Sequence, residues 1–259
     1  MEQIISELMK IFPLLNAYLA SGIFIFARLL GFFRMAPVFN RKEMPGMVKI
    51  GLIFLMTITL TAVVKPDVTV IKDSFMLSIL LNIVVGAMLG YVAQLILLAI
   101  DAGGDMVNMQ MGLSSAMVLD PTTSSQVSIV GKCFQFLGLI IFIQLGGIYW
   151  LLSAFVHSIE IFPLDATVIP LQELVNFDYV IKMSSNVLFM GLQIASPILL
   201  ATLGQDIILG VISKTAPQVN VFQLSFLFKP VLGAAIMVWI LPMLVNVISD
   251  YFLSYANIV

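Results

Sequence analysis

Long apolar runs alternate with shorter, more polar connections along the whole chain. Each run has ~18–26 residues, enough for a helix to cross ~30 Å of hydrocarbon. The six runs cover residues 11–33, 47–64, 75–100, 133–156, 187–209 and 231–253. Neither an internal repeat nor a long polar linker divides them. The pattern therefore predicts one all-helical (all-α) unit over residues 1–259, built from long apolar helices.

Composition narrows the class of protein. Hydrophobic residues make up 61% of the sequence and charged residues 10%, against roughly 45–50% and 25% in soluble domains. The surface must therefore face lipid or other proteins, and intrinsic disorder is excluded because disordered chains have low hydrophobicity. An outer-membrane barrel is disfavoured, since the apolar residues do not alternate. The net charge is −2 and no basic run is present, so no nucleic-acid partner is expected.

Basic residues are distributed unevenly among the connections. Residues 34–49 carry four basic residues, whereas residues 157–179 carry only acidic ones. If all six runs cross a bilayer, more of the basic residues lie on the side that holds residues 34–49. The positive-inside rule then predicts that both termini lie outside the cytoplasm.

Small and polar residues form stripes on three of the predicted helices, given a turn of ~100° per residue. The first stripe contains Asn82, Gly86, Gly90, Ala93, Gln94 and Asp101. The second contains Gly131, Gln135, Gly138 and Gly146, and the third contains Lys182, Asn186, Gln193, Pro197 and Gly204. Small residues let helix backbones approach closely, and amides can bond across the contact. Two interpretations stay open: packing within the chain, or seams that contact other subunits.

The connection over residues 101–126 is long for a helical protein and unusually apolar. Its glycines are Gly103, Gly104 and Gly112, and its methionines are Met106, Met109, Met111 and Met117, with Gln110 among them. Glycine permits unusual backbone angles, and methionine fits irregular, changing surfaces. Irregular backbone at membrane depth survives only inside protein or beside a water-filled cavity. The functional interpretation is a buried re-entrant segment that can act as a movable plug. The alternative, which composition alone favours, is that the methionines fill gaps in a static core.

A second informative connection covers residues 214–230. Pro217 ends a helix or starts a turn, and Asn220 can bond the backbone of that turn. Three phenylalanines follow, at positions 222, 226 and 228. This connection is either a docking element or an ordinary interhelical turn with an aromatic belt.

Groups for catalysis or metal binding are scarce. The chain has one histidine, His157, and one cysteine, Cys133. A histidine-based metal cluster and an internal disulfide are therefore impossible, and no phosphate-binding loop is present. We expect His157 to be packed or interfacial, Cys133 to be a buried thiol, and the protein to be no enzyme, with no cofactor. Arg28 and Arg34 lie ~240° apart around one helix, and Arg28, inside an apolar run, needs a partner that the sequence does not identify.

Several motifs together resemble one known family, the FliR family of flagellar type III secretion export-gate proteins, which is homologous to the injectisome SctT family. The C-terminal motif consists of Lys214, Pro217, Gln218, Val219, Asn220, Val221, Phe222, Phe228, Lys229 and Gly233. The opening helix and turn agree at Arg28, Gly31, Arg34, Pro37, Val38 and Phe39. The middle agrees at Ala102, Gly103, Gln110, Met111, Gly112, Asp120 and Pro121.

The resemblance implies a non-enzymatic subunit of the flagellar export gate in the bacterial inner membrane, within the flagellar basal body. It implies a fold like a fusion of FliP and FliQ, built from helical hairpins in a right-handed helical assembly raised in large part above the bilayer. The expected partners are FliP-like and FliQ-like subunits, an FlhB-like subunit, unfolded exported proteins and lipid. Residues 101–126 become the expected channel plug. The alternatives are an injectisome subunit or, in another class, a self-sufficient secondary transporter, which inverted repeats would favour.

Overall fold

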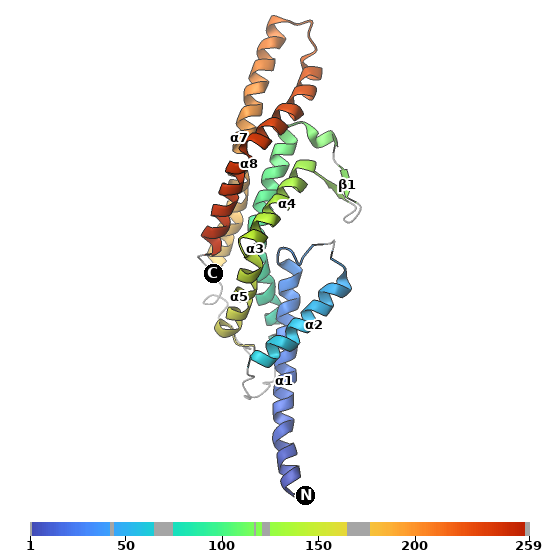
Figure 1. The fold of residues 1–259 in the computed structure, drawn as a ribbon, viewed down its shortest axis with the longest axis vertical. Coiled ribbons are helices and arrows are strands. Elements are labelled where there is room, and N and C mark those ends of the chain that lie inside the picture. The colour runs from blue at the N-terminus through green and yellow to red at the C-terminus, as the bar shows by residue number, and fades with distance from the viewer. Residues whose placement is uncertain are drawn as a thin grey trace. The chain divides into compact units, whose positions relative to one another are not determined.

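The computed structural model describes residues 2–41, 44–64, 75–116, 118–120, 125–164 and 177–256. Its helices are α1 (Glu2–Met35), α2 (Gly46–Val63), α3 (Phe75–Gln110), α4 (Ile129–Gln144), α5 (Gly147–Ile161), α7 (Phe177–Thr215) and α8 (Val221–Ala256) (Figure 1). A short 3-10 helix, Leu113–Ala116, and two antiparallel strands, β1 (Val118–Asp120) and β2 (Ser125–Val127), follow α3. The prediction of an all-helical protein with long apolar helices is confirmed, apart from this small hairpin.

The fourth apolar run does not form one straight helix. Leu145 and Gly146 interrupt it between α4 and α5, which are bent by 68°. Gly146 has a φ of +75°, a left-handed conformation that glycine adopts without steric cost. In the described part of the chain, five helices are long and apolar enough to cross a membrane, or six if the bent pair is one span. The apolar run at residues 133–156 therefore forms a bent pair of helices, and the six predicted runs match the count in which this pair is one span.

The chain forms two compact units. The first contains residues 1–94 and 151–178, and the second contains residues 95–150 and 179–259. All three changes from one unit to the other along the chain occur within helices: between Gln94 and Leu95 in α3, between Trp150 and Leu151 in α5, and between Asp178 and Tyr179 in α7. A boundary inside a helix leaves no linker in the sequence, which explains why composition gave no sign of it.

In the first unit, α1 packs against the first half of α3 at glycines. A Cβ atom on Gly31 would lie 2.0 Å from the carbonyl oxygen of Ile83, and one on Gly86 would lie 1.9 Å from that of Arg28. Phenylalanine rings fill the space around this contact, with Phe32 and Phe155 5.3 Å apart between ring centres. The glycines allow the two backbones to touch, and the rings fix the distance between the remaining faces.

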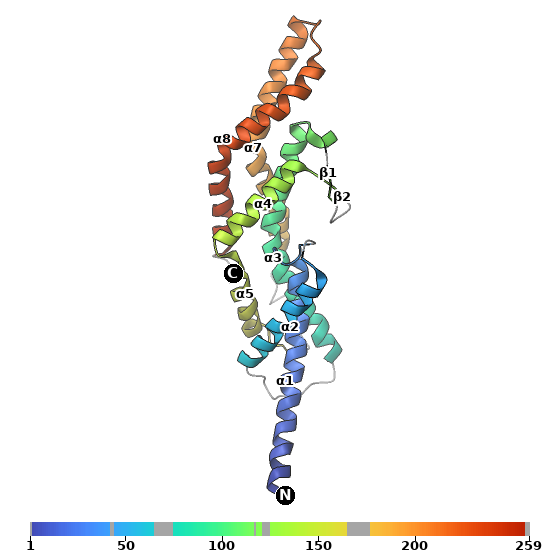
Figure 2. The same cartoon turned by 45° about the vertical axis from the view of Figure 1, so that its right-hand side comes forward.

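In the second unit, α4, α7 and α8 surround the second half of α3, and α7 and α8 form a long hairpin (Figure 2). Gly103 of α3 lies against Gly191 of α7, where an added Cβ would meet the Gly191 carbonyl at 2.8 Å. The rings of Phe142 and Phe252 join α4 to α8 at 5.3 Å. Three prolines lie inside the hairpin helices, Pro197, Pro230 and Pro242. Each removes a backbone hydrogen bond and bends its helix locally.

The segment 101–126 differs from the expected irregular connection. Residues 101–110 continue α3 as regular helix, so Gly103, Gly104, Met106, Met109 and Gln110 are helical. Gly103 and Gly104 serve close helix packing rather than unusual backbone angles, because an added Cβ on Gly104 would lie 2.7 Å from the Cα of Gly131. The irregular backbone begins at Met111 and Gly112, and Gly112 has a φ of +73°. Met117 lies outside the described residues.

Candidate functional site

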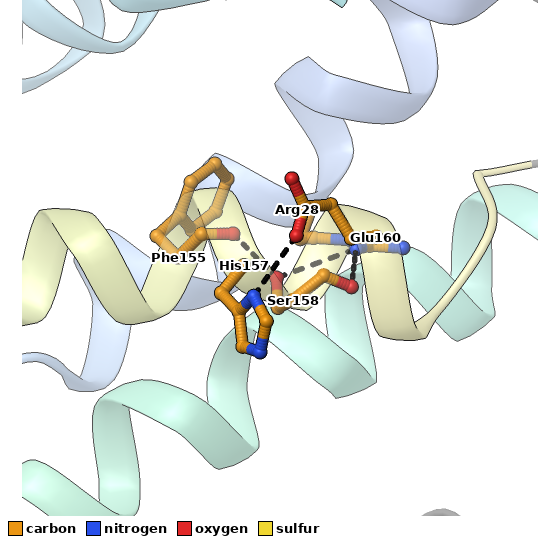
Figure 3. Close-up of polar contacts among 5 residues, drawn as sticks. All are labelled: Arg28, Phe155, His157, Ser158 and Glu160. Carbon is orange, nitrogen blue, oxygen red and sulfur yellow. Dashed lines mark hydrogen bonds and ion pairs between the residues drawn. The ribbon is translucent and has the colours of Figure 1, made fainter. Parts of the chain in front are cut away.

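Arg28 is a fully buried cation in the C-terminal third of α1. Its Nε donates to Asn82 Oδ1 at 2.9 Å, and its other nitrogens donate to the carbonyl oxygens of Ser158, at 2.8 Å, and Phe162, at 2.9 Å. The Phe162 ring lies 5.3 Å from the guanidinium carbon. Figure 3 shows Arg28 beside Ser158 near the end of α5. Among the described residues no carboxylate pairs with Arg28.

The acceptors that the structure describes for Arg28 are backbone carbonyls, the Asn82 amide oxygen and the Ser158 hydroxyl. The last turn of a helix carries carbonyls without intrahelical partners and a partial negative charge. Arg28 supplies donors and a positive charge to the C-terminal end of α5. Asn82 completes the arrangement, since its Nδ2 donates to the carbonyls of Ser78 and Leu164. This centre fixes α1, α3 and α5 to each other within the first unit.

His157 and Cys133, the single histidine and the single cysteine of the sequence, both lie on the surface of this chain. The Nδ1 atom of His157 lies 3.0 Å from Glu160 Oε2, one turn away on α5 (Figure 3), and both side chains are more than half exposed. Cys133 is exposed, so the expectation of a buried thiol is wrong: it lies on a face of α4 that this chain does not cover. In the part of the chain that the structure describes, no group of three metal-ligating side chains gathers.

The first predicted seam is used within the chain. Asn82 binds Arg28, Gly86 meets the Arg28 carbonyl, and Gly90 approaches the backbone of Phe32 and Ala36. Gln94 is half-buried on the same helix. Of the two interpretations left open by the stripe, packing within the chain therefore accounts for Asn82, Gly86 and Gly90.

The third stripe is different, because much of it faces away from this chain. Lys182 and Gln193 are exposed, Asn186 is half-buried, and Gly204 has no atom within 4 Å of an added Cβ. Gln193 Oε1 accepts a hydrogen bond from the Tyr251 hydroxyl. The second stripe is split, since Gly131 and Gly138 pack against α3 whereas Gly146 lies in the bend after α4.

Substitution of Gly86 tests the close contact in the first unit. Gly86→Ala is expected to destabilise the protein by about 2–4 kcal/mol, because a Cβ would overlap the Arg28 backbone and force the helices apart. Gly51→Ala in α2 is the matched control, since an added Cβ there meets nothing within 4 Å. Thermal unfolding of the purified protein measures both. Equal melting temperatures for the two variants would contradict this packing.

The base of the segment that follows α3 is held by polar contacts. The Ser128 hydroxyl caps α4, accepting from the Gly131 amide at 2.9 Å and donating to Asp105 Oδ1. Gln110 Nε2 donates to Asp206 Oδ2 at 3.5 Å, and Asp206 Oδ1 lies 2.7 Å from Lys229 Nζ. Through Asp206, the structure thus links Gln110, which lies within the expected plug, to Lys229, a residue of the C-terminal motif.

The C-terminal motif forms the turn between α7 and α8. Pro217 and Gln218 are exposed in that turn, and Asn220 Oδ1 accepts from the Gln223 amide at 3.2 Å, an N-cap contact. Phe222, the first of the three phenylalanines, is 81% exposed. The turn is therefore well formed by its own residues, yet it presents aromatic surface that this chain leaves uncovered.

Sequence reasoning missed several of these partners. The acceptors of Arg28 include backbone carbonyls, which carry no residue signature, at positions 130 and 134 residues away. Asp206 had a detectable signal, because it is the only charged residue between Lys182 and Lys214. Within the described residues, the side-chain amides of Asn108 and Gln205 are buried without a hydrogen-bond partner. No sequence pattern distinguishes such amides from satisfied ones.

Comparison with known proteins decides the family. The family model described as bacterial export proteins, family 1, matches residues 19–255, which is nearly the whole chain. The chain belongs to this family. The matched range contains both Arg28 and the turn between α7 and α8 that carries the C-terminal motif.

Individual relatives agree with this assignment to the export proteins. Flagellar biosynthetic protein FliR of Bacillus subtilis (strain 168) is 28% identical over 207 residues, covering 79% of this chain and 80% of that protein. The FliR protein of Escherichia coli (strain K12) is 25% identical over 232 residues, covering 89% and 88%. Yop proteins translocation protein T of Yersinia pestis is 27% identical over 214 residues, covering 82% of each chain. The resemblance to the FliR family is confirmed, and the apolar helices identify a multi-pass membrane protein.

Proposed function

We propose that this chain is a gate-forming, non-enzymatic subunit of the flagellar type III protein export apparatus in the bacterial inner membrane. It contributes to the path by which unfolded flagellar subunits leave the cell for flagellum assembly. The observation that carries the proposal is the family match over residues 19–255, together with FliR relatives that align over about four-fifths or more of both chains.

Helix length supports a role inside an assembly. The helices α3, α7 and α8 have 36, 39 and 36 residues, which corresponds to ~54–59 Å at ~1.5 Å per residue. The hydrocarbon core of a bilayer is only ~30 Å thick. The apolar surface beyond that depth needs cover from protein. FliP-like and FliQ-like subunits, with an FlhB-like subunit beside them, are the proposed cover.

Two surfaces are proposed to contact these subunits. One is the exposed stripe of α7, with Lys182, Asn186, Gln193 and Gly204. The other is the aromatic surface at the α7–α8 turn, where Phe222 and Phe226 are 81% and 60% exposed. Both surfaces combine apolar area with small or polar groups, which suits helix packing against a neighbour.

Residues 111–127, here called the gate segment, are proposed to close the path. Its described residues leave α3 at a left-handed glycine, form a 3-10 turn and two paired antiparallel strands, and return at the Ser128 cap. Backbone that departs from the α-helix in this way suits a position within protein or beside an aqueous path. Met106, Met109 and Gln110 belong to the helix that carries the segment.

A second candidate function is a subunit of a virulence-type secretion system. The similarity to Yop proteins translocation protein T favours it, because that protein aligns over as much of this chain as the Bacillus subtilis relative does. The two candidates share the proposed gate and differ in the proteins that pass through it. Deletion of the gene separates them, since the flagellar function predicts loss of flagella.

Co-purification tests the assembly directly. The chain, tagged and expressed with untagged FliP-like, FliQ-like and FlhB-like proteins from the same genome, is expected to bring them down in one complex with fixed ratios, measured by native mass spectrometry. Gly204→Trp, on the exposed stripe of α7, is expected to weaken this recovery, whereas Gly46→Trp at the exposed start of α2 serves as the matched control. Recovery of a monodisperse, solitary chain that transports a solute would overturn the proposal.

A further inference from the structure

We propose that Asp206 and Lys229, with Gln110, form a latch that holds the start of the gate segment against the α7–α8 hairpin. The inference rests on the proposed function and adds a positioning role for these three residues. It explains why α7 between Lys182 and Lys214, and α8 before Asp250, each carry a single charged residue. Asp206 is the only charged residue between Lys182 and Lys214, and Lys229 is the only one between Lys214 and Asp250.

The charged pair is the strong element of the latch. Lys229 Nζ and Asp206 Oδ1 lie 2.7 Å apart, and their side chains are 20% and 38% exposed. A charge within an apolar stretch is costly and marks a functional position. Opposite charges on two adjacent helices remove that cost only while the helices stay in this register. The pair therefore fixes α7 against α8 at one level of the hairpin.

The other carboxylate oxygen of Asp206 reaches the gate. Gln110 Nε2 donates to Asp206 Oδ2 at 3.5 Å, a long contact that is weaker than the ion pair. Gln110 is the last residue of α3, directly before the irregular backbone begins. One carboxylate thus links α3, α7 and α8 at the point where the gate segment leaves the helix.

An apolar contact reinforces the same point. Met111 is buried, and its Cγ, Cε and Sδ atoms lie 2.7–2.9 Å from the position of a Cβ on Gly233. Gly233 follows Lys229 by one turn on α8, so the two residues share a face. The Met111 side chain packs against the backbone of Gly233, where a larger residue would leave no room for it. Met111, the first residue of the gate segment, is therefore held by α8, the helix that carries Lys229.

The far end of the gate segment is tied elsewhere. Ser128 bonds Asp105 of α3 and caps α4, and neither residue contacts the latch. Release of the latch can therefore free Met111 and Gly112, while the contacts of Ser128 stay in place. The side-chain amides of Asn108 and Gln205, which are buried and have no hydrogen-bond partner among the described residues, lie on α3 and α7, two of the three helices that the latch joins. Unpaired buried amides destabilise the closed arrangement and favour a second one in which they find partners.

The test measures two quantities in the same assembled complex: disulfide formation between positions 111 and 233, and ion leakage. Met111→Cys and Gly233→Cys are introduced together in a Cys133→Ser background, and the complex with its native partners is oxidised in membranes. We expect a disulfide within the chain. Asp206→Asn and Lys229→Gln each lower the rate at which the disulfide forms at least about threefold, since each removes the ion pair between Asp206 and Lys229. The exchange Asp206→Lys with Lys229→Asp restores the rate, and Lys214→Gln, at the exposed end of α7, leaves it unchanged.

Ion leakage through the complex separates the latch from the proposed function. We expect leakage to rise in the two single variants and to fall when the disulfide is formed. Unchanged cross-linking in both single variants overturns the latch, whatever the leakage. Altered cross-linking with leakage that never changes supports the latch and overturns the gate. Failure of the exchanged pair to restore cross-linking also counts against the latch, because a pair held by charge alone tolerates reversal.

Discussion

Replacement of Arg28 by leucine is expected to destabilise the protein by about 3–5 kcal/mol, because it removes the donors of several buried acceptors at once. The substitution leaves Asn82 Oδ1 and the Phe162 carbonyl without the donors that Arg28 supplies, whereas the Ser158 carbonyl keeps the Phe162 amide as a donor. Each buried polar atom left unpaired costs about 1–3 kcal/mol. Thermal unfolding of the purified complex, and the amount of complex recovered from membranes, measure the loss.

Arg28→Lys separates charge from geometry. Lysine keeps the positive charge at the end of α5 but cannot bridge Asn82 and two carbonyls as a planar guanidinium does. An intermediate loss is therefore expected. Arg34→Leu is the matched control, because Arg34 is exposed on the same helix and a change within about 0.5 kcal/mol is expected there. Full stability of the Arg28→Leu variant would show that α5 needs no cap.

Shortening the gate segment is expected to raise ion leakage severalfold while leaving assembly intact. The change replaces residues 118–127 with a Gly-Gly-Ser connection and retains Met111 and the Ser128 cap. A narrow, protein-lined constriction excludes ions only while it is filled. Leakage is measured as ion flux across vesicles that contain the complex. A larger deletion over 106–117 is unsuitable, because Val107 and Asn108 are fully buried in α3.

A length-matched variant shows what closes the path. Residues 118–127 are replaced by ten residues of Gly and Ser, so that chain length stays constant while hydrophobic side chains are lost. Leakage between that of the native and the shortened protein indicates that both bulk and apolar packing contribute. A correctly assembled complex with the shortened segment and native leakage would contradict a gating role for this segment.

The apolar pattern predicted the helices because a helix that is hydrophobic over about 20 residues is the stable way to bury backbone in lipid or protein. It could not predict the bend at Gly146, since one glycine in an apolar run looks the same whether it packs or turns. Gly103 and Gly104 produced the opposite error. Their sequence suggested irregular backbone, whereas they allow helices to touch at Gly191 and Gly131.

The candidate site was predictable only where side-chain chemistry is visible in the sequence. The C-terminal motif and the methionine-rich segment could be marked, but nothing indicated that Gln110 meets Asp206, 96 residues away. Arg28 was recognised as a cation that needs a partner. Its main partners are carbonyls, and every residue has a carbonyl, so the pairing depends on the packing of α1 against α5.

Photo-cross-linking to an exported protein tests the central claim most directly, namely that the gate segment lies on the export path. A benzoylphenylalanine residue is placed at Ser114, an exposed position in the gate segment, and the assembled complex carries a substrate stalled in transit. The control position is Met47, at the exposed start of α2. The account predicts adducts with the substrate at Ser114 and none at Met47. Adducts at Ser114 with lipid alone, while the stalled substrate cross-links elsewhere, would contradict it.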